Sequence, residues 1–279
     1  MKLGQWISEA RARLRLEGSP TPAADVKSIA CHVLGVDASW LIIHDEYVLE
    51  PFQEKKLNEM LGSRCSGMPV AYIVGHRGFW DLDLKCDKCT LIPQPDTETL
   101  VEVALKYAPQ GGRVLDLATG TGAVALALKS ERPDLWVEGC DIVSDAVELA
   151  RQNAAFNGLD VKFYISDWFS EVDGQFDLIT ANPPYVAEND PHLACGDVRF
   201  EPVTALVAGD NGLADLRHII SGAGEFLVDG GALLLEHGYN QAQPVRDMFL
   251  SFDYESIGTV ADLGGNPRVT GGIKRKSIH

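Results

Sequence analysis

The stretch Val114-Leu115-Asp116-Leu117-Ala118-Thr119-Gly120-Thr121-Gly122 decides the fold of this chain. Its first half is an apolar run typical of a buried strand, and its second half is a turn of small residues that leads into a helical pattern. A small-residue turn between a strand and a helix lets a ligand approach the backbone closely. The stretch therefore predicts the first strand, turn and helix of an α/β fold, with a ligand bound at the turn.

The sequence that follows this turn keeps alternating between strand and helix patterns. Alternation of this kind predicts a mostly parallel sheet with helices on both faces. The expected strands are 114–118, 135–140, 161–165, 176–181 and 232–236, with two closing strands at 256–260 and 268–272, and the expected helices are 123–130, 145–157, 213–228 and 241–250.

The N-terminal quarter has a different pattern. Apolar residues recur at helical spacing from Trp6 to Leu14, Thr21-Pro22 is a favourable helix start, and a further helix is expected at 51–64. Alternating segments at 72–74, 79–84 and 90–92 then predict strands of a hairpin. We therefore expect a helical domain at 1–70, a β-hairpin linker at 71–95 and an α/β domain at 96–279.

Composition and charge narrow the class of protein. The chain has 279 residues, is 46% hydrophobic and has a net charge of −16. Residues 1–85 hold 10 Lys+Arg and 11 Asp+Glu (net −1), whereas residues 86–279 hold 14 and 29 (net −15). An acidic domain repels phosphate backbones and favours a basic protein partner, so direct nucleic-acid binding is not expected. No apolar run reaches membrane-helix or signal-peptide length, which predicts a cytoplasmic protein without membrane contact.

The six cysteines do not predict a metal site. Only Cys86 and Cys89 have metal or redox spacing, and a zinc site would need a second pair at similar spacing. We interpret all six as ordinary thiols and expect no metal.

The turn at 118–122 favours a nucleoside cofactor. The second expected strand ends in Gly139-Cys140-Asp141, about 20 residues after the turn, where an acidic side chain can hold ribose hydroxyls. The glycine spacing differs from the dinucleotide fingerprint G-x-G-x-x-G, and the turn has no basic residue for a phosphate. These features favour S-adenosylmethionine over a dinucleotide.

The tetrapeptide Asn182-Pro183-Pro184-Tyr185 predicts the reacting site. It directly follows the expected strand 176–181, and its prolines stiffen the loop because they lack a backbone N–H and restrict Asn182. Asn182 and the Pro183 carbonyl supply acceptors, and Tyr185 supplies a flat aromatic face. Two acceptors and an aromatic face suit a planar –NH2 group, so the sequence predicts a methyltransferase acting on an amide or an exocyclic amine.

With these motifs in view, the chain resembles one family, the HemK/PrmC protein-glutamine N5-methyltransferases that modify peptide chain release factors. The resemblance covers almost the whole chain. Its most specific motif is Ile92-Pro93-Gln94-Pro95-Asp96-Thr97-Glu98, and it extends through the turn, Ser166–Ser170, Asn182–Tyr185, Gly196–Pro202, Leu234–Gly238 and Gly264–Thr270.

The resemblance implies a fold, a substrate and roles for individual residues. The expected fold is a Rossmann-like, seven-stranded class I methyltransferase domain with a small helical domain that docks class I release factors. The expected target is the glutamine of a Gly-Gly-Gln loop, which Asn182 and Pro183 would orient while Tyr185 stacks on it. The implied cofactor-binding residues are Ala118, Thr119, Gly120, Thr121, Gly122, Asp141, Trp168 and Asn182, and the implied substrate-binding residues are Asn182, Pro183, Pro184 and Tyr185, of which Asn182, Pro183 and Tyr185 would be catalytic.

Two positions depart from the family pattern. The first glycine of the cofactor turn is Ala118, which costs on the order of 1 kcal/mol if the backbone there needs a positive φ. Gln94 stands where the family usually has Arg, which removes a positive charge near the site.

Two other readings compete with glutamine methylation. A nucleic-acid adenine-N6 methyltransferase could use the same loop on a flipped base, but the acidic catalytic half argues against it. An inactive protein that binds the cofactor or the release factor is the non-enzyme alternative, motivated by Ala118 and Gln94.

Overall fold

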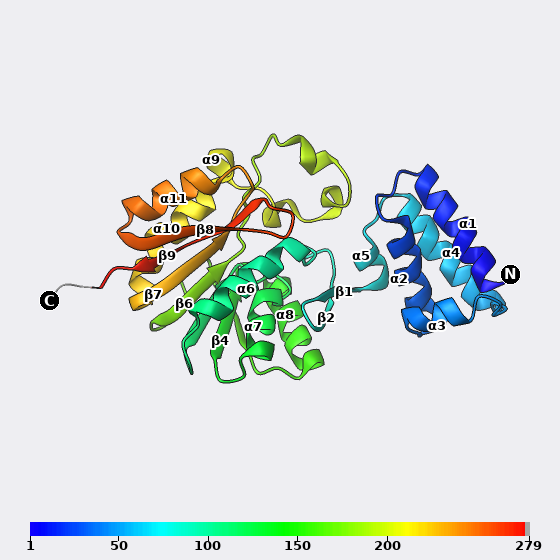
Figure 1. Ribbon diagram of the computed structural model, residues 1–279, viewed down its shortest axis with the longest axis horizontal. Helices are drawn as coiled ribbons and strands as arrows, with labels where there is room; N and C mark the ends of the chain where they lie inside the picture. The colour runs from blue at the N-terminus through cyan, green and yellow to red at the C-terminus, as the bar shows by residue number, and fades with distance from the viewer. Residues whose placement is uncertain (277–279) are drawn as a thin grey trace. The chain divides into compact units, whose positions relative to one another are not determined.

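The computed structural model describes residues 1–276, in which the chain forms two units. The first unit contains Met1–His76 together with His192–Phe200, and the second contains Arg77–Pro191 and residues 201–276 (Figure 1). The division differs from the expected one because a short segment from the middle of the sequence belongs to the N-terminal unit.

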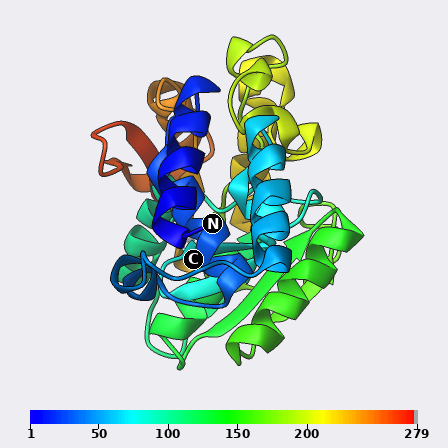
Figure 2. The same ribbon diagram turned by 90° about the vertical axis from the view of Figure 1, so that its right-hand side faces the viewer.

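The first unit is helical, as expected. The blue and cyan helices of Figure 2 run alongside one another around a small apolar core that includes Leu3, Trp6, Ile29 and Leu57. A helix-initiating proline begins two of the helices, and Gly35 ends one of them with φ 66°. The helices are α1 (Leu3–Leu16), α2 (Pro22–Leu34), α3 (Ala38–Ile43), α4 (Pro51–Cys65) and α5 (Val70–Val74).

The strands expected at 72–74 and 90–92 are wrong. The segment 72–74 lies in α5, where the alternating apolar pattern is too short to outweigh a helical turn bounded by Pro69 and a left-handed Gly75. The segment 90–92 is not a strand either. Its Ile92 N–H donates to Glu201 Oε2 at 2.9 Å, so this donor is not available to a β-ladder.

A hairpin is present as expected, but its turn falls at Trp80-Asp81, so the expected strand 79–84 is wrong, and the hairpin is not a separate linker. It consists of β1 (His76–Phe79) and β2 (Leu82–Lys85), and all of it except His76 groups with the second unit. The Asn153 side chain joins it to helix α8 (Ser144–Asn157), because its amide accepts from Lys85 N at 2.8 Å and donates to Lys85 O at 3.2 Å.

The second unit is built on a seven-stranded sheet, which confirms the expected methyltransferase architecture. The strands follow the order β5-β4-β3-β6-β7-β9-β8, and β9 runs antiparallel to both of its neighbours. Because β4 and β6 flank β3 on opposite sides, the strand order reverses at β3, where α/β sheets bind ligands. The bounds are β3 (Arg113–Leu117), β4 (Trp136–Asp141), β5 (Lys162–Ile165), β6 (Phe176–Ala181), β7 (Leu227–Glu236), β8 (Tyr254–Ala261) and β9 (Pro267–Lys274).

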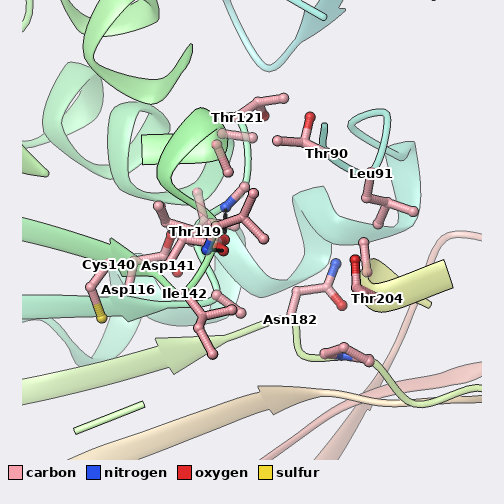
Figure 3. Close-up of a pocket in the computed structure, with 18 of the residues that line it drawn as sticks. Thr90, Leu91, Asp116, Thr119, Thr121, Cys140, Asp141, Ile142, Asn182 and Thr204 are labelled. Carbon is pink, nitrogen blue, oxygen red and sulfur yellow. Dashed lines mark hydrogen bonds between the residues drawn. The ribbon is translucent and has the colours of Figure 1, made fainter. Parts of the chain in front are cut away.

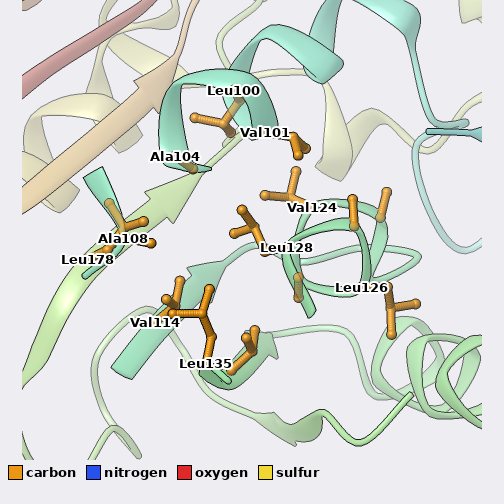
Figure 4. Packing of buried hydrophobic residues seen from close by; sticks show 14 of the residues in the cluster. Leu100, Val101, Ala104, Ala108, Val114, Val124, Leu126, Leu128, Leu135 and Leu178 are labelled. Atoms are coloured by element: carbon orange, nitrogen blue, oxygen red, sulfur yellow. The ribbon is translucent and has the colours of Figure 1, made fainter. Parts of the chain in front are cut away.

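Helices cover both faces of this sheet. On one face, Leu100 and Val124 lie over Val114 and Leu178 (Figure 4). On the other face, the core includes Ile219 and other buried apolar side chains. Besides α8, the helices of this unit are α6 (Glu98–Tyr107), α7 (Ala123–Glu131), α9 (Gly209–Gly212), α10 (Ala214–Phe226) and α11 (Ala242–Ser251).

Short 3-10 turns complete the two units, at Pro95–Thr97, Pro191–Ala194, Val198–Phe200 and Val203–Ala205. Among residues 1–276, none of the helices combines the length and the apolar character that crossing a membrane requires.

Candidate active site

A pocket opens beyond the carboxyl ends of β3, β4 and β6. Its lining comes from the turn after β3, the ends of the neighbouring strands and the loop after β6. Figure 3 shows Asn182 across this pocket from Thr119 and Asp141. The structure brings together most of the predicted cofactor residues here, namely Ala118, Thr119, Gly120, Thr121, Asp141, Trp168 and Asn182.

Gly122 does not line the pocket. It starts α7 with φ 82°, and a Cβ at this position would lie 3.0 Å from the Phe163 ring and 3.3 Å from the Ala150 Cβ. The glycine therefore serves the close packing of the helix on the sheet and does not itself contact the space where a ligand would bind.

Asp141 ties the first two turns together. Its Oδ2 accepts from Gly120 N at 2.9 Å, and its Oδ1 accepts from Val143 N at 3.0 Å. Burial raises the pKa of this carboxyl, although both backbone hydrogen bonds act in the opposite direction. The carboxylate is fixed at the end of β4, with one face toward the pocket.

Asp116 supports the turn from below. Its two carboxylate oxygens accept from the Thr119 hydroxyl at 2.6 Å and the Thr180 hydroxyl at 2.8 Å. Burial raises the pKa of Asp116 to about 6, while these hydrogen bonds lower it. The pair of hydroxyls holds the carboxyl between β3 and β6, beneath the turn that contains Ala118.

The charge of the lining fits a cation and not a phosphate. Four carboxyl groups line the pocket, those of Asp116, Asp141, Asp167 and Asp215, whereas no Lys or Arg of the described residues 1–276 does. The sulfonium and ammonium groups of S-adenosylmethionine are cations, and the ribose suits Asp141. The residues present therefore fit this cofactor better than a dinucleotide, as the sequence predicted.

The loop after β6 presents Asn182 to the pocket. Pro184 lines the same space, whereas Pro183 is buried and Tyr185 is half-buried outside the lining. The Tyr185 hydroxyl instead donates to Glu236 Oε1 at 3.2 Å. Of the four predicted substrate residues, the structure thus places two in the pocket wall and two behind it.

Two further elements support this loop from outside the pocket. The Gln241 side chain donates to Tyr185 O at 2.9 Å. Gly212 ends α9 with φ 84°, and a Cβ there would lie 2.1 Å from Tyr185 O. Any larger residue at position 212 would therefore displace the backbone at Tyr185.

Glu236, at the end of β7, is a residue that the sequence analysis did not single out. It is 2% exposed, and burial raises its pKa to about 7, while hydrogen bonds from Thr97 and Tyr185 and the charge of Arg268 lower it. Arg268 is itself paired with Asp96 and Asp262, each at 3.1 Å. The strand pattern predicted the position of Glu236, but a strand end alone gave no reason to assign it to the site.

Thr97 lies at the N-cap position of α6, and Asp96 directly precedes it. The structure shows no side-chain cap at the start of α6. The Thr97 hydroxyl instead accepts from Asn182 Nδ2 at 3.2 Å, and Asp96 pairs with Arg268. The signal that could have identified Thr97 is its place in the most specific family motif, two residues after Pro95.

The Gln94 side chain lines the pocket and donates to Ile92 O at 3.0 Å.

Cys86 and Cys89, the pair with metal or redox spacing, are free thiols. Burial raises the pKa of the Cys86 and Cys89 thiols to about 12, so both stay protonated at neutral pH. Within residues 1–276, His, Cys, Asp and Glu side chains form no group of three that could hold a metal ion.

Comparisons with known proteins agree with this geometry. Residues 5–75 match the family model described as PrmC N-terminal domain, and residues 94–200 match the one described as Methyltransferase small domain. The chain is 49% identical over 268 residues to the release factor glutamine methyltransferase of Vibrio cholerae, covering 95% of this chain and 94% of the relative. It is 46% identical over 273 residues to that of Escherichia coli K12, covering 97% and 98%.

Solved structures share the fold at lower identity. A methyltransferase from Pyrococcus furiosus superimposes with a TM-score of 0.54 at 18% identity, over 70% of this chain and 89% of that one. This likeness concerns the fold alone.

Proposed function

Because the chain belongs to the family of release factor glutamine methyltransferases, we propose that it transfers a methyl group to the side-chain N5 of the glutamine in the Gly-Gly-Gln loop of class I peptide chain release factors. The observation that supports this most directly is the position of Asn182, which lines the pocket opposite Asp141 on a loop stiffened by two prolines.

S-adenosylmethionine is the cofactor of this family and supplies an activated methyl group on a sulfonium. The structure offers Ala118 to Thr121 for its methionine part, Asp141 for the ribose and Trp168 for the adenine. The four carboxyl groups of the lining favour its cationic groups by simple charge attraction.

An amide nitrogen is a weak nucleophile because its lone pair is delocalised into the carbonyl. Asn182 Oδ1 and the Pro183 carbonyl are acceptors that would take up both N–H bonds of the glutamine amide and orient its nitrogen toward the methyl donor. Positioning in a near-attack geometry lowers a barrier by roughly 7–11 kcal/mol. The same acceptors stabilise the positive charge that grows on nitrogen during the transfer.

The helical unit is the proposed docking surface for the release factor. Its exposed side chains include the large apolar residues Ile42, Ile43 and Phe52, which are between 69% and 80% accessible. Large apolar side chains left exposed on a small domain fit a protein-binding surface. The net charge of −15 of residues 86–279 complements a basic partner.

Methyl transfer from labelled S-adenosylmethionine to a purified, unmodified release factor tests the proposal. The matched control is the same factor with the glutamine of its Gly-Gly-Gln motif changed to alanine. We expect label on the first and none on the second. Equal label on both would show a different acceptor, and label on neither, with the cofactor bound, would show that the substrate is not a release factor. Transfer to duplex DNA or RNA under the same conditions would support the adenine-N6 alternative.

A further inference from the structure

Two hydrogen bonds connect the pocket wall and the loop after β6 to groups behind them. Asn182 Nδ2 donates to Thr97 Oγ1 at 3.2 Å, and the Tyr185 hydroxyl donates to Oε1 of the buried Glu236 carboxyl at 3.2 Å. The Thr97 hydroxyl lies near enough to the same carboxyl to lower its pKa. Three segments that are distant in the sequence thus meet here: the residue before α6, the loop after β6 and the end of β7.

The number of hydrogen atoms on these hydrogen-bonded groups decides which way the Asn182 amide faces. A threonine hydroxyl has one hydrogen and two lone pairs, and the Glu236 carboxyl only accepts once it is ionised, above its pKa of about 7. The Thr97 hydrogen therefore points to Glu236, and lone pairs of the hydroxyl face Asn182. Only the NH2 side of the Asn182 amide can donate to them, so its Oδ1 is turned to the other side, toward the pocket.

The orientation matters because a reversed Asn182 amide would be useless for the proposed reaction. With Nδ2 toward the pocket, a donor would face the N–H bonds of the substrate amide, and two donors facing each other leave both unsatisfied. An asparagine without a fixed partner has no strong preference between its two orientations, because oxygen and nitrogen occupy nearly the same volume.

We propose that Thr97 and Glu236 are positioning residues for glutamine methylation, which lock Asn182 with its Oδ1 acceptor toward the substrate and hold the Tyr185 ring beside it. This inference rests on the proposed function. Thr97 lines the pocket and acts on the substrate through Asn182, whereas Glu236 lies outside the lining and acts through Thr97 and Tyr185.

The test compares three single variants in the full-length protein. Thr97→Val keeps the shape of the side chain and removes the hydroxyl, whereas Thr97→Ser keeps the hydroxyl. Thr99→Val removes another buried threonine hydroxyl two residues further along α6, outside this network. For each variant we would measure kcat and KM for the release factor, the Kd for S-adenosylmethionine by calorimetry and the melting temperature.

We expect Thr97→Val to lower kcat by about tenfold or more, because the acceptor toward the substrate is no longer fixed. Its cofactor Kd should change less than kcat does, since Thr97→Val leaves Asp141 and the turn at 118–121 in place. Thr97→Ser should recover most of the lost turnover, and Thr99→Val should turn over like the parent.

A double-mutant cycle with Asn182→Ala separates positioning from a general structural effect. If Thr97 acts through Asn182, Thr97→Val causes no further loss of kcat once Asn182 is alanine. A Thr97→Val variant as fast as the parent, or one whose loss is equally large with and without Asn182, would overturn the inference. If the parent itself fails to methylate the release factor, the proposed function fails instead, so the two failures are distinguishable.

Discussion

At the scale of single residues, the backbone of Ala118 conflicts with its side chain. It has φ 51° at the first position of the cofactor turn, where a Cβ costs roughly 1–2 kcal/mol relative to a relaxed backbone. Ala118→Gly should therefore raise the free energy of unfolding by up to about 1 kcal/mol, since glycine also loses more entropy on folding. Denaturant unfolding without cofactor measures this, and Ala118→Val is the matched opposite, expected to be less stable than the parent. A less stable Ala118→Gly would contradict the argument.

Glu236 should make stability depend on pH. Burial raises its pKa from 4.5 to about 7, against the opposing effects of Thr97, Arg268 and Tyr185, so the folded protein holds this proton more tightly than the unfolded chain. The stabilisation is complete below about pH 4.5 and is lost as the pH rises toward 7, at up to about 1.4 kcal/mol per pH unit.

The check on this dependence is a difference between two proteins. Glu236→Gln cannot titrate, so the unfolding free energy of the parent minus that of the variant should fall between pH 5 and pH 7.5. Subtracting the variant removes the contributions of Asp116 and the other carboxyl groups, which titrate in both. A difference that stays flat across this range would show that Glu236 keeps an ordinary pKa.

At this scale, sequence predicted the residues whose chemistry is visible from their type and place. Asp141 ends a strand that follows a glycine turn, and Asn182 precedes two prolines, so each has a local signal. Thr97 has no such signal, because a threonine before a helix is more often a cap. Its role depends on Glu236, 139 positions later in the sequence, and only the folded sheet brings the two together.

Among the secondary-structure elements, the short helix α9 helps to hold the loop after β6 in place. Gly212 at its end packs directly against Tyr185 O, where an added Cβ would lie at 2.1 Å, and its φ of 84° also favours glycine. Gly212→Ala should displace the loop after β6, lower kcat by more than tenfold and reduce the unfolding free energy by about 1–3 kcal/mol.

Gly224 offers a matched control for that substitution. It lies in α10, and a Cβ there would meet nothing within 4 Å. Gly224→Ala should therefore leave turnover at the parent level and stabilise the helix by roughly 0.5–1 kcal/mol. Parallel assays of methyl transfer and thermal unfolding on both variants test the pair, and equal activity of Gly212→Ala and Gly224→Ala would refute the role given to α9.

Elements with a long pattern were predicted well, and short ones were not. The strand 176–181 has the expected bounds, and helix α8 begins one residue before its prediction. The segments 72–74 and 90–92 are three residues each, too short for a period of two to be distinguished from a helical turn or an extended loop. Their structures depend on a neighbouring glycine and on Glu201, respectively.

Across the whole molecule, Arg64 joins parts of the first unit that are far apart in the sequence. Its buried guanidinium donates to Asp25 Oδ2 and to Asp197 Oδ1, each at 2.8 Å. Asp25 is equally buried, whereas the Asp197 side chain is 46% exposed. Arg64→Met would leave the Asp25 carboxylate without its cation, and removing one partner of a buried pair costs roughly 3–5 kcal/mol.

Asp197→Asn is the milder comparison. Because this carboxylate is half in solvent, its loss should cost about 1 kcal/mol or less. Thermal unfolding of the two variants and the parent gives the order of stability, with Arg64→Met far below Asp197→Asn. Equal stability of the two variants would show that Asp25 does not depend on Arg64.

The nine residues His192–Phe200 limit how the helical unit could be exchanged between proteins during evolution. They belong to the helical unit, but in the sequence they follow the loop after β6, and the chain returns to the methyltransferase unit at Glu201. The helical unit is therefore not an N-terminal cassette that recombination could exchange by a single crossover. An N-terminal segment from another protein would have to pack against His192–Phe200 as the native one does. We therefore expect residues 1–76 and 192–200 to be inherited together.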